Sequence, residues 1–227
     1  MKHEFYLFRH GETDWNKQGK MQGSADIPLN PTGLKQAEAL REFFDSFVKG
    51  GKGAGAGEFF LQRDLVSSDL TRALQTAAIA FRLKDHALIR RDPRFRETHL
   101  GKAEGLNREE LVTQFGEEIW NQWIGLGEST WDARFPEGES KADVRDRATA
   151  AILDLAREQH STMGSQVSDG SGLRRIAVAT HGGLVRRLLH SLLPEEKTPI
   201  DVVNGSVFLF TLENGVLTAD RAPIFTP

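Results

Sequence analysis

The length, composition and charge of the chain exclude several classes of protein. The chain has 227 residues, of which 39% are hydrophobic and 27% are charged, and these proportions are typical of a globular protein rather than a disordered one. Because the formal net charge is -3, we expect no general affinity for nucleic acid or for anionic membranes. The absence of cysteine excludes disulfides, thiolate metal sites and a cysteine nucleophile.

Targeting signals are absent from the sequence as given. The N-terminal residues Met1–Tyr6 include Lys2 and Glu4 and lack the apolar stretch of a secretory signal. No apolar run approaches the roughly 20 residues that a membrane-spanning helix requires. We therefore expect a cytoplasmic protein with no membrane partner. The sequence does not indicate an oligomeric state, and a homodimer is left open.

Strand and helix signals alternate in the first part of the chain. Phe5–Phe8 is a short apolar run typical of a buried strand, and the aperiodic stretch Gly11–Leu29 is expected to be a long ordered loop. Asn30 and Pro31 are typical of a helix N-cap and a first helical position, and helical spacing continues to about Val48. A second strand and a second helix are predicted further along, at Leu65–Ser67 and Asp69–Phe81.

A segment made almost entirely of Gly, Ala and Lys, Lys49–Gly57, follows the first predicted helix. One strand and one helix precede it, which is too little for an independent core. We therefore interpret it as a flexible surface insertion, near residues 49–57, in a single domain that covers residues 1–227.

Three more helices and three more strands are predicted in the rest of the chain. The helices are Asn107–Trp123, a segment capped by Ser140 that ends near Gln159, and Leu184–Leu193, with irregular segments at Gly125–Glu139 and Ser161–Gly172. The strands are Ile176–Thr180, Val207–Leu212 and Val216–Thr218, the last two joined by an Asn214-Gly215 hairpin turn. This alternation predicts an α/β fold, a three-layer α/β/α sandwich around a mostly parallel sheet.

Two of the predicted strands end in a histidine followed by glycine. Phe5–Phe8 leads into Arg9-His10-Gly11, and Ile176–Thr180 leads into His181-Gly182-Gly183. Sites in such folds form at the carboxyl ends of strands, and glycine lets backbone amides approach a ligand closely. If the two strands are neighbours, both imidazoles and the Arg9 guanidinium converge on one point, to which Arg72 adds a second guanidinium.

A pocket with two guanidiniums suits a dianionic phosphate, because the arginine fork matches phosphate oxygens bidentately. The cations would also neutralise charge on a transferring phosphoryl group, a role that a metal ion has elsewhere. The sequence contains no HExxH motif, EF-hand loop or cysteine pair. We therefore expect neither a metal nor a cofactor, and a small phosphomonoester as the binding partner.

Four segments carry these residues in a fixed order. The first is Arg9–Thr13, followed by Asn16, Gly19, Gln22-Gly23, Asp26 and Pro28-Leu29. The second is Ser67–Ala73. The third is Arg96-Glu97, followed by Leu100-Gly101 and Glu104-Gly105, and the fourth is Thr180–Gly183. Together they resemble the histidine phosphatase superfamily, the phosphoglycerate-mutase-like proteins, and they run from Phe5 to about Gly183. The resemblance implies the fold of that superfamily.

The resemblance also implies a role for each matching residue. His10 would attack phosphorus and form a phosphohistidine, and Glu97 would protonate the leaving oxygen and then accept a proton from water. Arg9, Arg72 and His181 would stabilise the phosphoryl oxygens. Further contacts to the phosphate would come from Asn16, Gln22 and Gly182. A carboxyl in the role of Glu97 is expected to be partly buried, and Glu104 is a competing candidate for that role.

The branch of the family is harder to infer than the family itself. Glycolytic mutases hold a substrate carboxylate with an arginine pair after the proton donor and another in the helix beyond. Here Thr98 follows Glu97, and Trp123–Leu126 contains no arginine pair, although Arg108 resembles the mutase lysine at that place. Arg96–Gly101 and Phe135–Ser140 look more like the broad-specificity phosphatase branch, from which Ala103 departs.

The sequence therefore favours a phosphomonoesterase acting on small phosphorylated metabolites. Two alternatives stay open: phosphoryl transfer of the phosphoglycerate mutase type, and a non-catalytic phosphate-binding interaction module. The second is disfavoured because every expected polar group is present. Trp120, Trp123 and Trp131 are interpreted as packing residues without a role in the site.

Overall fold

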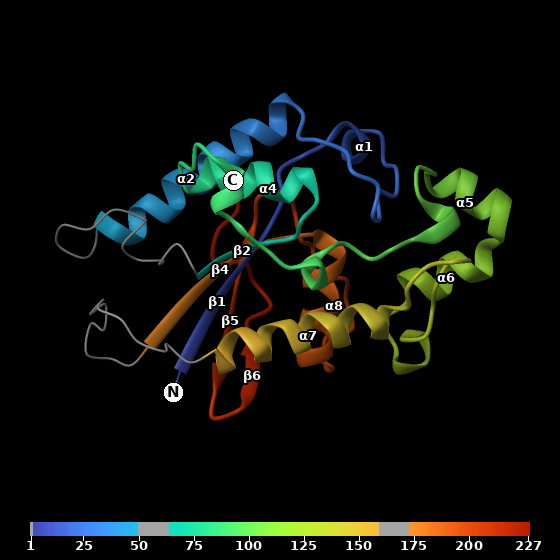
Figure 1. Ribbon diagram of the computed structural model, residues 1–227. Helices are drawn as coiled ribbons and strands as arrows, with labels where there is room; N and C mark the ends of the chain where they lie inside the picture. The colour runs from blue at the N-terminus through green and yellow to red at the C-terminus, as the bar shows by residue number, and fades with distance from the viewer. Residues whose placement is uncertain (1, 50–63, 159–172) are drawn as a thin grey trace.

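The sheet that runs through the molecule has six strands in the order β3-β2-β4-β1-β5-β6. The computed structural model describes residues 2–49, 64–158 and 173–227 (Figure 1). The strands are β1 (Lys2–Arg9), β2 (Leu65–Ser67), β3 (Arg90–Arg91), β4 (Leu173–Thr180), β5 (Val207–Glu213) and β6 (Val216–Ala219). The predicted insertion near 49–57 and the predicted loop Ser161–Gly172 lie almost wholly outside the described residues.

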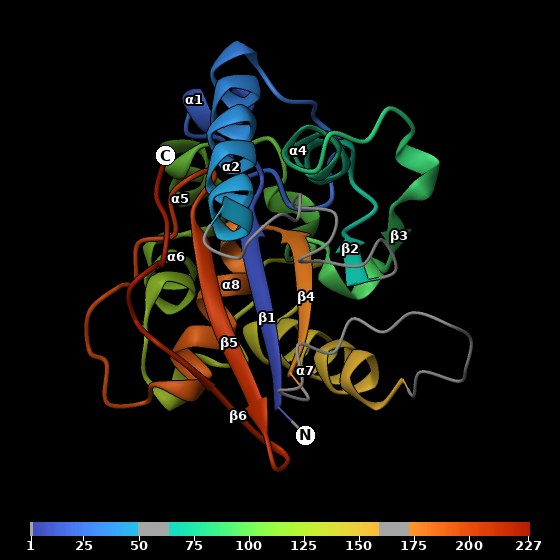
Figure 2. The same ribbon diagram turned by 90° about the vertical axis from the view of Figure 1, so that its left-hand side faces the viewer.

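The pairing of β1 with β4 decides where the site forms. These two strands are parallel neighbours, in a register that sets Phe5 opposite Ile176 and Arg9 opposite Thr180. The pairs β2–β4 and β2–β3 are also parallel, whereas β1–β5 and β5–β6 are antiparallel. The expectation of a mostly parallel sheet is therefore confirmed, and Figure 2 shows β1 beside β4 along their whole length.

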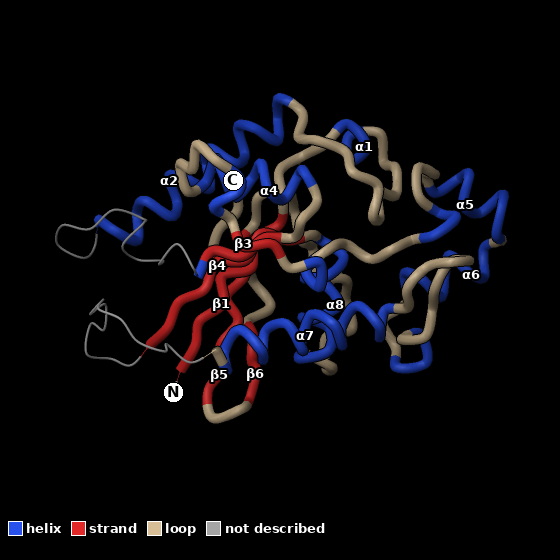
Figure 3. Tube along the Cα trace, viewed as in Figure 1, coloured by secondary structure: helices blue, strands red, loops and turns tan. Residues whose placement is uncertain are grey.

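Each face of the sheet is covered by a pair of helices. Alternate side chains of a strand point to opposite faces, so Phe5 and Leu7 belong to one core and Tyr6 and Phe8 to the other. On the first face lie α7 (Lys141–Arg157) and α8 (Gly182–Leu192), and on the second lie α2 (Pro31–Lys49) and α4 (Thr71–Ala80). The arrangement is the predicted three-layer sandwich (Figure 3).

Local sequence explains where the long helices begin. The Asn30 side chain accepts a hydrogen bond from the Gly33 amide at 2.9 Å, which confirms Asn30 as the cap of α2. Ser140 caps α7 through a capping box with Asp143. None of the described helices is long and apolar enough to cross a membrane.

The structure differs from the sequence-based elements in three places. The predicted loop Gly11–Leu29 contains a short helix, α1 (Asp14–Lys17), closed by a capping box between Thr13 and Asn16. The strand β3 was not predicted, because two exposed arginines carry no strand pattern. The single helix expected at Asn107–Trp123 is two helices.

Those two helices are α5 (Arg108–Phe115) and α6 (Glu117–Ile124). Gly116 separates them with a φ of 89°, a conformation that a helix cannot include and that glycine adopts without strain. A small third core, which includes Leu111, Trp123 and Phe135, joins them to the loops beneath. Figure 1 shows α5 and α6 beyond the end of the sheet, away from its two main faces.

Candidate active site

The paired ends of β1 and β4 bring His10 and His181 together. The His10 amide donates to the Thr180 carbonyl at 3.0 Å, so the backbones of β1 and β4 stay paired up to the two histidines. The imidazole centroids are 5.1 Å apart, and both side chains are buried. The convergence expected from the sequence is confirmed as geometry.

A single short contact decides which nitrogen of His10 is available. Nδ1 lies 2.6 Å from the Gly11 carbonyl oxygen, and a carbonyl can only accept, so Nδ1 carries the proton. Nε2 is then the nitrogen with the free lone pair. Burial, followed by the charges of Arg72 and Arg9, holds the pKa of His10 well below 6.5. The ring is therefore neutral at physiological pH.

His181 is held by Ser68, from the end of β2. His181 Nε2 lies 2.8 Å from Ser68 Oγ, and Ser68 Oγ also accepts the Leu70 amide. Because Ser68 is fully buried and its hydroxyl reaches no other acceptor among the described residues, we assign its proton to Nε2, which leaves the proton of a neutral ring on Nδ1. Nδ1 is buried and has no hydrogen-bond partner among the described residues. Burial, followed by the charge of Arg72, holds the pKa of His181 well below 6.5.

Arg9 and Arg72 are fixed by backbone carbonyls rather than by carboxylates. Arg9 Nη1 donates to Val202 O at 2.6 Å, and Arg72 donates to Ala25 O and Gly23 O at 2.6 and 2.8 Å. Neither forms an ion pair with any residue that the structure describes, and the Nε of each is buried without a partner. Burial lowers the pKa of both to about 10, so both stay charged.

Asn16 and Gln22 present amide donors to the same cavity. The Asn16 carbonyl oxygen accepts from Thr13, and the Gln22 carbonyl oxygen accepts from Thr13 Oγ1 at 2.9 Å. With their oxygens occupied, the two NH2 groups are free to donate to a ligand. Asn204 also binds Asn16, at 3.3 Å, and its amide donates to the His10 carbonyl at 3.0 Å. Asn204 was missed from the sequence, where it stands in no motif.

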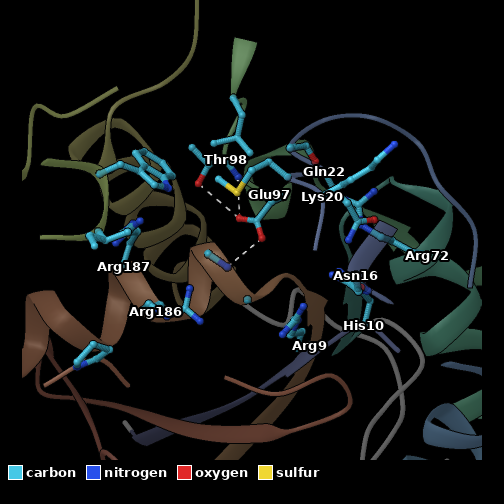
Figure 4. A pocket seen from close by; sticks show the side chains of 18 of the residues that line it. Arg9, His10, Asn16, Lys20, Gln22, Arg72, Glu97, Thr98, Arg186 and Arg187 are labelled. Carbon is cyan, nitrogen blue, oxygen red and sulfur yellow. Dashed lines mark hydrogen bonds between the residues drawn. The ribbon is translucent and has the colours of Figure 1, made fainter. Parts of the chain in front are cut away.

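Glu97 lies between the histidines and the far wall of the cavity. Its Oε2 accepts the Gly183 amide at 2.9 Å, and its Oε1 accepts the Thr98 amide at 2.8 Å. Figure 4 shows the carboxyl across the pocket from His10, above Arg9. The side chain is half-buried, as expected. The competing candidate, Glu104, does not line the cavity and instead accepts from Ser24 and His99.

Glycine is required where α8 begins. A Cβ on Gly183 would overlap the Glu97 carboxylate, and a Cβ on Gly182 would lie 3.0 Å from Arg9 Nε. The absence of side chains therefore allows the first turn of α8 to reach both groups. Gly182, predicted as a phosphate-binding residue, lines the cavity with Gly183.

Arg147, on α7, anchors the Glu97 segment from behind. It donates to the backbone carbonyls of Arg94, Arg96 and Glu97 at 2.6, 2.9 and 3.0 Å. Its Nε also pairs with Glu139 at 2.8 Å. One side chain thus joins the segment Arg94–Glu97 to a helix, and no sequence motif indicated this role.

The cavity holds about 410 Å³, and its far wall differs from the sequence-based expectation. Trp120 and Trp123 line it, so the interpretation of these two as packing residues alone is wrong; Trp123 does both, since it also contacts Phe135. Two cations that the sequence did not single out, Arg186 and Arg187 of α8, line it as well. His99 and Arg108 do not line it.

A family model decides what kind of site this is. The model of the histidine phosphatase superfamily (branch 1) matches residues 5–222. The chain belongs to the histidine phosphatase superfamily. The resemblance inferred from four short segments is confirmed over nearly the whole length.

Known histidine phosphatases and mutases are similar to this chain. The probable phosphoglycerate mutase GpmB of Proteus mirabilis is 37% identical over 159 residues, 70% of this chain and 66% of that protein. The glucosyl-3-phosphoglycerate phosphatase of Mycolicibacterium vanbaalenii is 32% identical over 203 residues, 86% of this chain and 76% of that one. A solved structure of mycobacterial glucosyl-3-phosphoglycerate phosphatase with VO3 has a TM-score of 0.70 at 26% identity, covering 96% of each chain. These relatives support a phosphatase-type enzyme.

Arg147→Met is predicted to loosen the Glu97 segment of this histidine phosphatase. The substitution removes the side-chain donor from three carbonyls and the cation that pairs with Glu139, so we expect the free energy of unfolding to fall by about 2 kcal/mol. Faster hydrogen exchange at the His99 amide, which Glu139 holds at 2.8 Å, should accompany it. Arg145→Met, on the same helix, is the control: it removes an ion pair with the exposed Asp146 and a contact over Trp131, and it should change stability by less than about 1 kcal/mol. Equal effects of the two substitutions would contradict the anchoring role.

A second prediction concerns the protonation of His10. Imidazole NMR should show His10 neutral at pH 6.5 and below, and Arg72→Met should raise its pKa toward 6.5 by removing a buried cation. In the unfolded chain the histidines bind protons as the pH falls through about 6.5, whereas in the folded chain His10 and His181 stay neutral. Above that pH these histidines therefore do not reduce the free energy of unfolding. It should decrease at lower pH, by up to about 1.4 kcal/mol per pH unit for each buried histidine. Protonation of His10 above pH 6.5 would contradict the account.

Proposed function

We propose that the chain is a phosphomonoesterase that hydrolyses small phosphorylated metabolites through a phosphohistidine on His10. The observation that carries the proposal is the Nδ1 contact to Gly11, because it leaves a neutral imidazole with Nε2 free in a pocket that two guanidiniums make positive. A nucleophile must be neutral to attack; burial, together with the two cations, lowers the pKa of His10, and the same cations attract the phosphate. We further propose that the whole chain acts as one domain.

In the first step, His10 Nε2 attacks phosphorus in line with the bond to the leaving group. The N–P bond forms, the P–O bond breaks, and Glu97 gives its proton to the leaving oxygen. Arg9 and Arg72 bind the three other phosphoryl oxygens, and His181 donates from Nδ1, the nitrogen that Ser68 leaves unpaired. Donors fixed before the substrate arrives need no reorganisation in the transition state.

Neutral donors complete the binding of the phosphoryl group. The NH2 groups of Asn16 and Gln22 and the backbone amide of Gly182 contact its oxygens. In the second step, water attacks phosphorus, Glu97 accepts the proton of that water, and the N–P bond breaks to give inorganic phosphate. Oε1 of Glu97 accepts from both the amide and the hydroxyl of Thr98, whereas Oε2 accepts from the Gly183 amide and keeps a lone pair for these transfers.

Phosphoryl transfer of the mutase type is the second candidate, and one observation favours it. The chain lacks the arginine pairs that hold the substrate carboxylate in the glycolytic mutases. However, Arg186 and Arg187 supply two cations to the cavity from α8. The relative from Proteus mirabilis is also named as a probable phosphoglycerate mutase. A non-catalytic role remains disfavoured, because the expected polar side chains other than His181 line one cavity, and the His181 ring lies 5.1 Å from the ring of His10.

The proposal is tested by phosphate release from p-nitrophenyl phosphate in EDTA. We expect turnover by the wild-type protein and a loss of at least about a thousandfold in kcat for His10→Ala. His86→Ala, which changes an exposed histidine that does not line the cavity, is the matched control and should keep wild-type turnover. Turnover by His10→Ala at the wild-type rate would refute the nucleophile.

Glu97→Gln separates the general acid from a merely structural carboxyl. The p-nitrophenolate leaves without a proton, whereas the alkoxide of glycerol 3-phosphate requires one. The decrease in kcat/KM should therefore be larger for glycerol 3-phosphate than for p-nitrophenyl phosphate. Equal decreases for both substrates would contradict the assignment of Glu97 as the acid.

A further inference from the structure

Arg187 is a buried cation that the proposed chemistry does not use. Its side chain is only 6% exposed, yet it lines the active-site cavity. Its Nε is buried, and no hydrogen bond or ion pair joins the Arg187 side chain to another residue in the described part of the chain. The guanidinium lies 4.9 Å from the centre of the Trp123 ring, a cation–π contact that positions it without neutralising it.

The surroundings of Arg187 add positive charge rather than removing it. Burial, followed by the charge of Arg186, lowers the pKa of Arg187 to about 10, and Glu97 is the carboxylate that opposes this. Lys141, which packs on Trp123 from α7, has its own pKa lowered to about 7 by burial and by Arg187. An unpaired buried charge costs free energy, so its retention at the wall of a cavity indicates a ligand.

The position of Arg187 shows which part of a ligand it would meet. Figure 4 places Arg186 and Arg187 on one side of the pocket and His10, Asn16 and Arg72 on the other, with Glu97 between them. Arg186 donates from Nε to the Ile200 carbonyl at 3.1 Å, and its guanidinium forms no ion pair with a carboxylate in the part of the chain that the structure describes. The same cavity also has an apolar part of its wall, which includes Trp120, Ile124 and Leu126.

We propose that Arg187, supported by Arg186, forms a second anion subsite, and that the substrate carries a compact oxyanion, a carboxylate or a second phosphate, beyond its reacting phosphate. The inference rests on the proposed function and deepens it, because it names the substrate class. Trp123 holds the guanidinium plane in place, so the fork meets the oxyanion bidentately. The apolar wall then contacts the carbon skeleton between the two anionic groups.

The test compares substrate pairs that differ in one anionic group. The carboxylate pair is 3-phosphoglycerate and glycerol 3-phosphate, and the phosphate pair is fructose 1,6-bisphosphate and fructose 6-phosphate. In each pair, the ratio of kcat/KM values measures the preference for the second anion. We expect a preference of about tenfold or more in at least one pair, and Arg187→Met should reduce it by about ten- to a hundredfold. The pair that responds identifies the oxyanion.

Two further variants guard against a merely structural effect. Arg187→Lys keeps the charge and loses the fork, so it should retain an intermediate preference. Arg145→Met removes an arginine that lies 5.0 Å over Trp131 and does not line the cavity, and it should leave the preference unchanged. A preference near one in both pairs, or one that Arg187→Met does not change, would overturn the inference.

Failure of the inference is distinguishable from failure of the proposed function. Turnover of p-nitrophenyl phosphate, which has no second anion, with no preference in either pair would refute the subsite alone. If no compound is hydrolysed, the proposed function fails. The preference within each pair would then be measured as the ratio of the two dissociation constants from calorimetry. A preference in binding that Arg187→Met removes would then support the subsite, and equal affinities would overturn it.

Discussion

Positive charge buried at the end of a parallel strand pair is the constraint on which the rest of the site depends. The register of β1 with β4 places Arg9 opposite Thr180, so the two histidines that follow must share one space. Arg9 and Arg72 enter that space with carbonyl partners instead of carboxylates. Carbonyl partners hold the guanidiniums in position but leave their charge available. Burial first, and this charge second, lowers the pKa of both imidazoles and keeps them neutral, and the charge also attracts a dianion.

The opposite wall of the pocket contributes one carboxyl, that of Glu97, which faces the positive charges of Arg9 and Arg72. Glu97 is held by the first turn of α8 from one side and, through its backbone, by Arg147 of α7 from the other. Both helices pack on the same face of the sheet as Phe5 and Leu7. The core that carries the strand pair therefore also fixes the distance between the nucleophile and the proposed acid.

The parts of this site that could be predicted are those encoded locally. His10 and His181 each follow an apolar strand and precede glycine, and Arg72 stands at the start of a helix, so their convergence follows from the sheet alone. Arg187 could not be found in this way, because its neighbour Trp123 comes from α6, whose position depends on tertiary packing. Asn204 lies in a turn without a motif, and its role exists only because β5 pairs with β1.

The errors have the same origin. Gly116 breaks the helix expected at Asn107–Trp123, and the break sets α6 against the cavity, so that a tryptophan assigned to packing also forms a wall of the pocket. A helical spacing of apolar residues indicates that they are buried, and residues such as Trp123 that line a cavity are largely buried as well. Sequence patterns alone do not separate these two environments.

Rapid acid-free quenching followed by tandem mass spectrometry tests the central claim most directly. The enzyme would be mixed with p-nitrophenyl phosphate, stopped within one turnover at alkaline pH, and fragmented to locate any added phosphoryl group. The account predicts one phosphoryl group, on His10, that decays as inorganic phosphate appears. Release of phosphate without any phosphorylated protein, or a phosphoryl group on another residue, would contradict it.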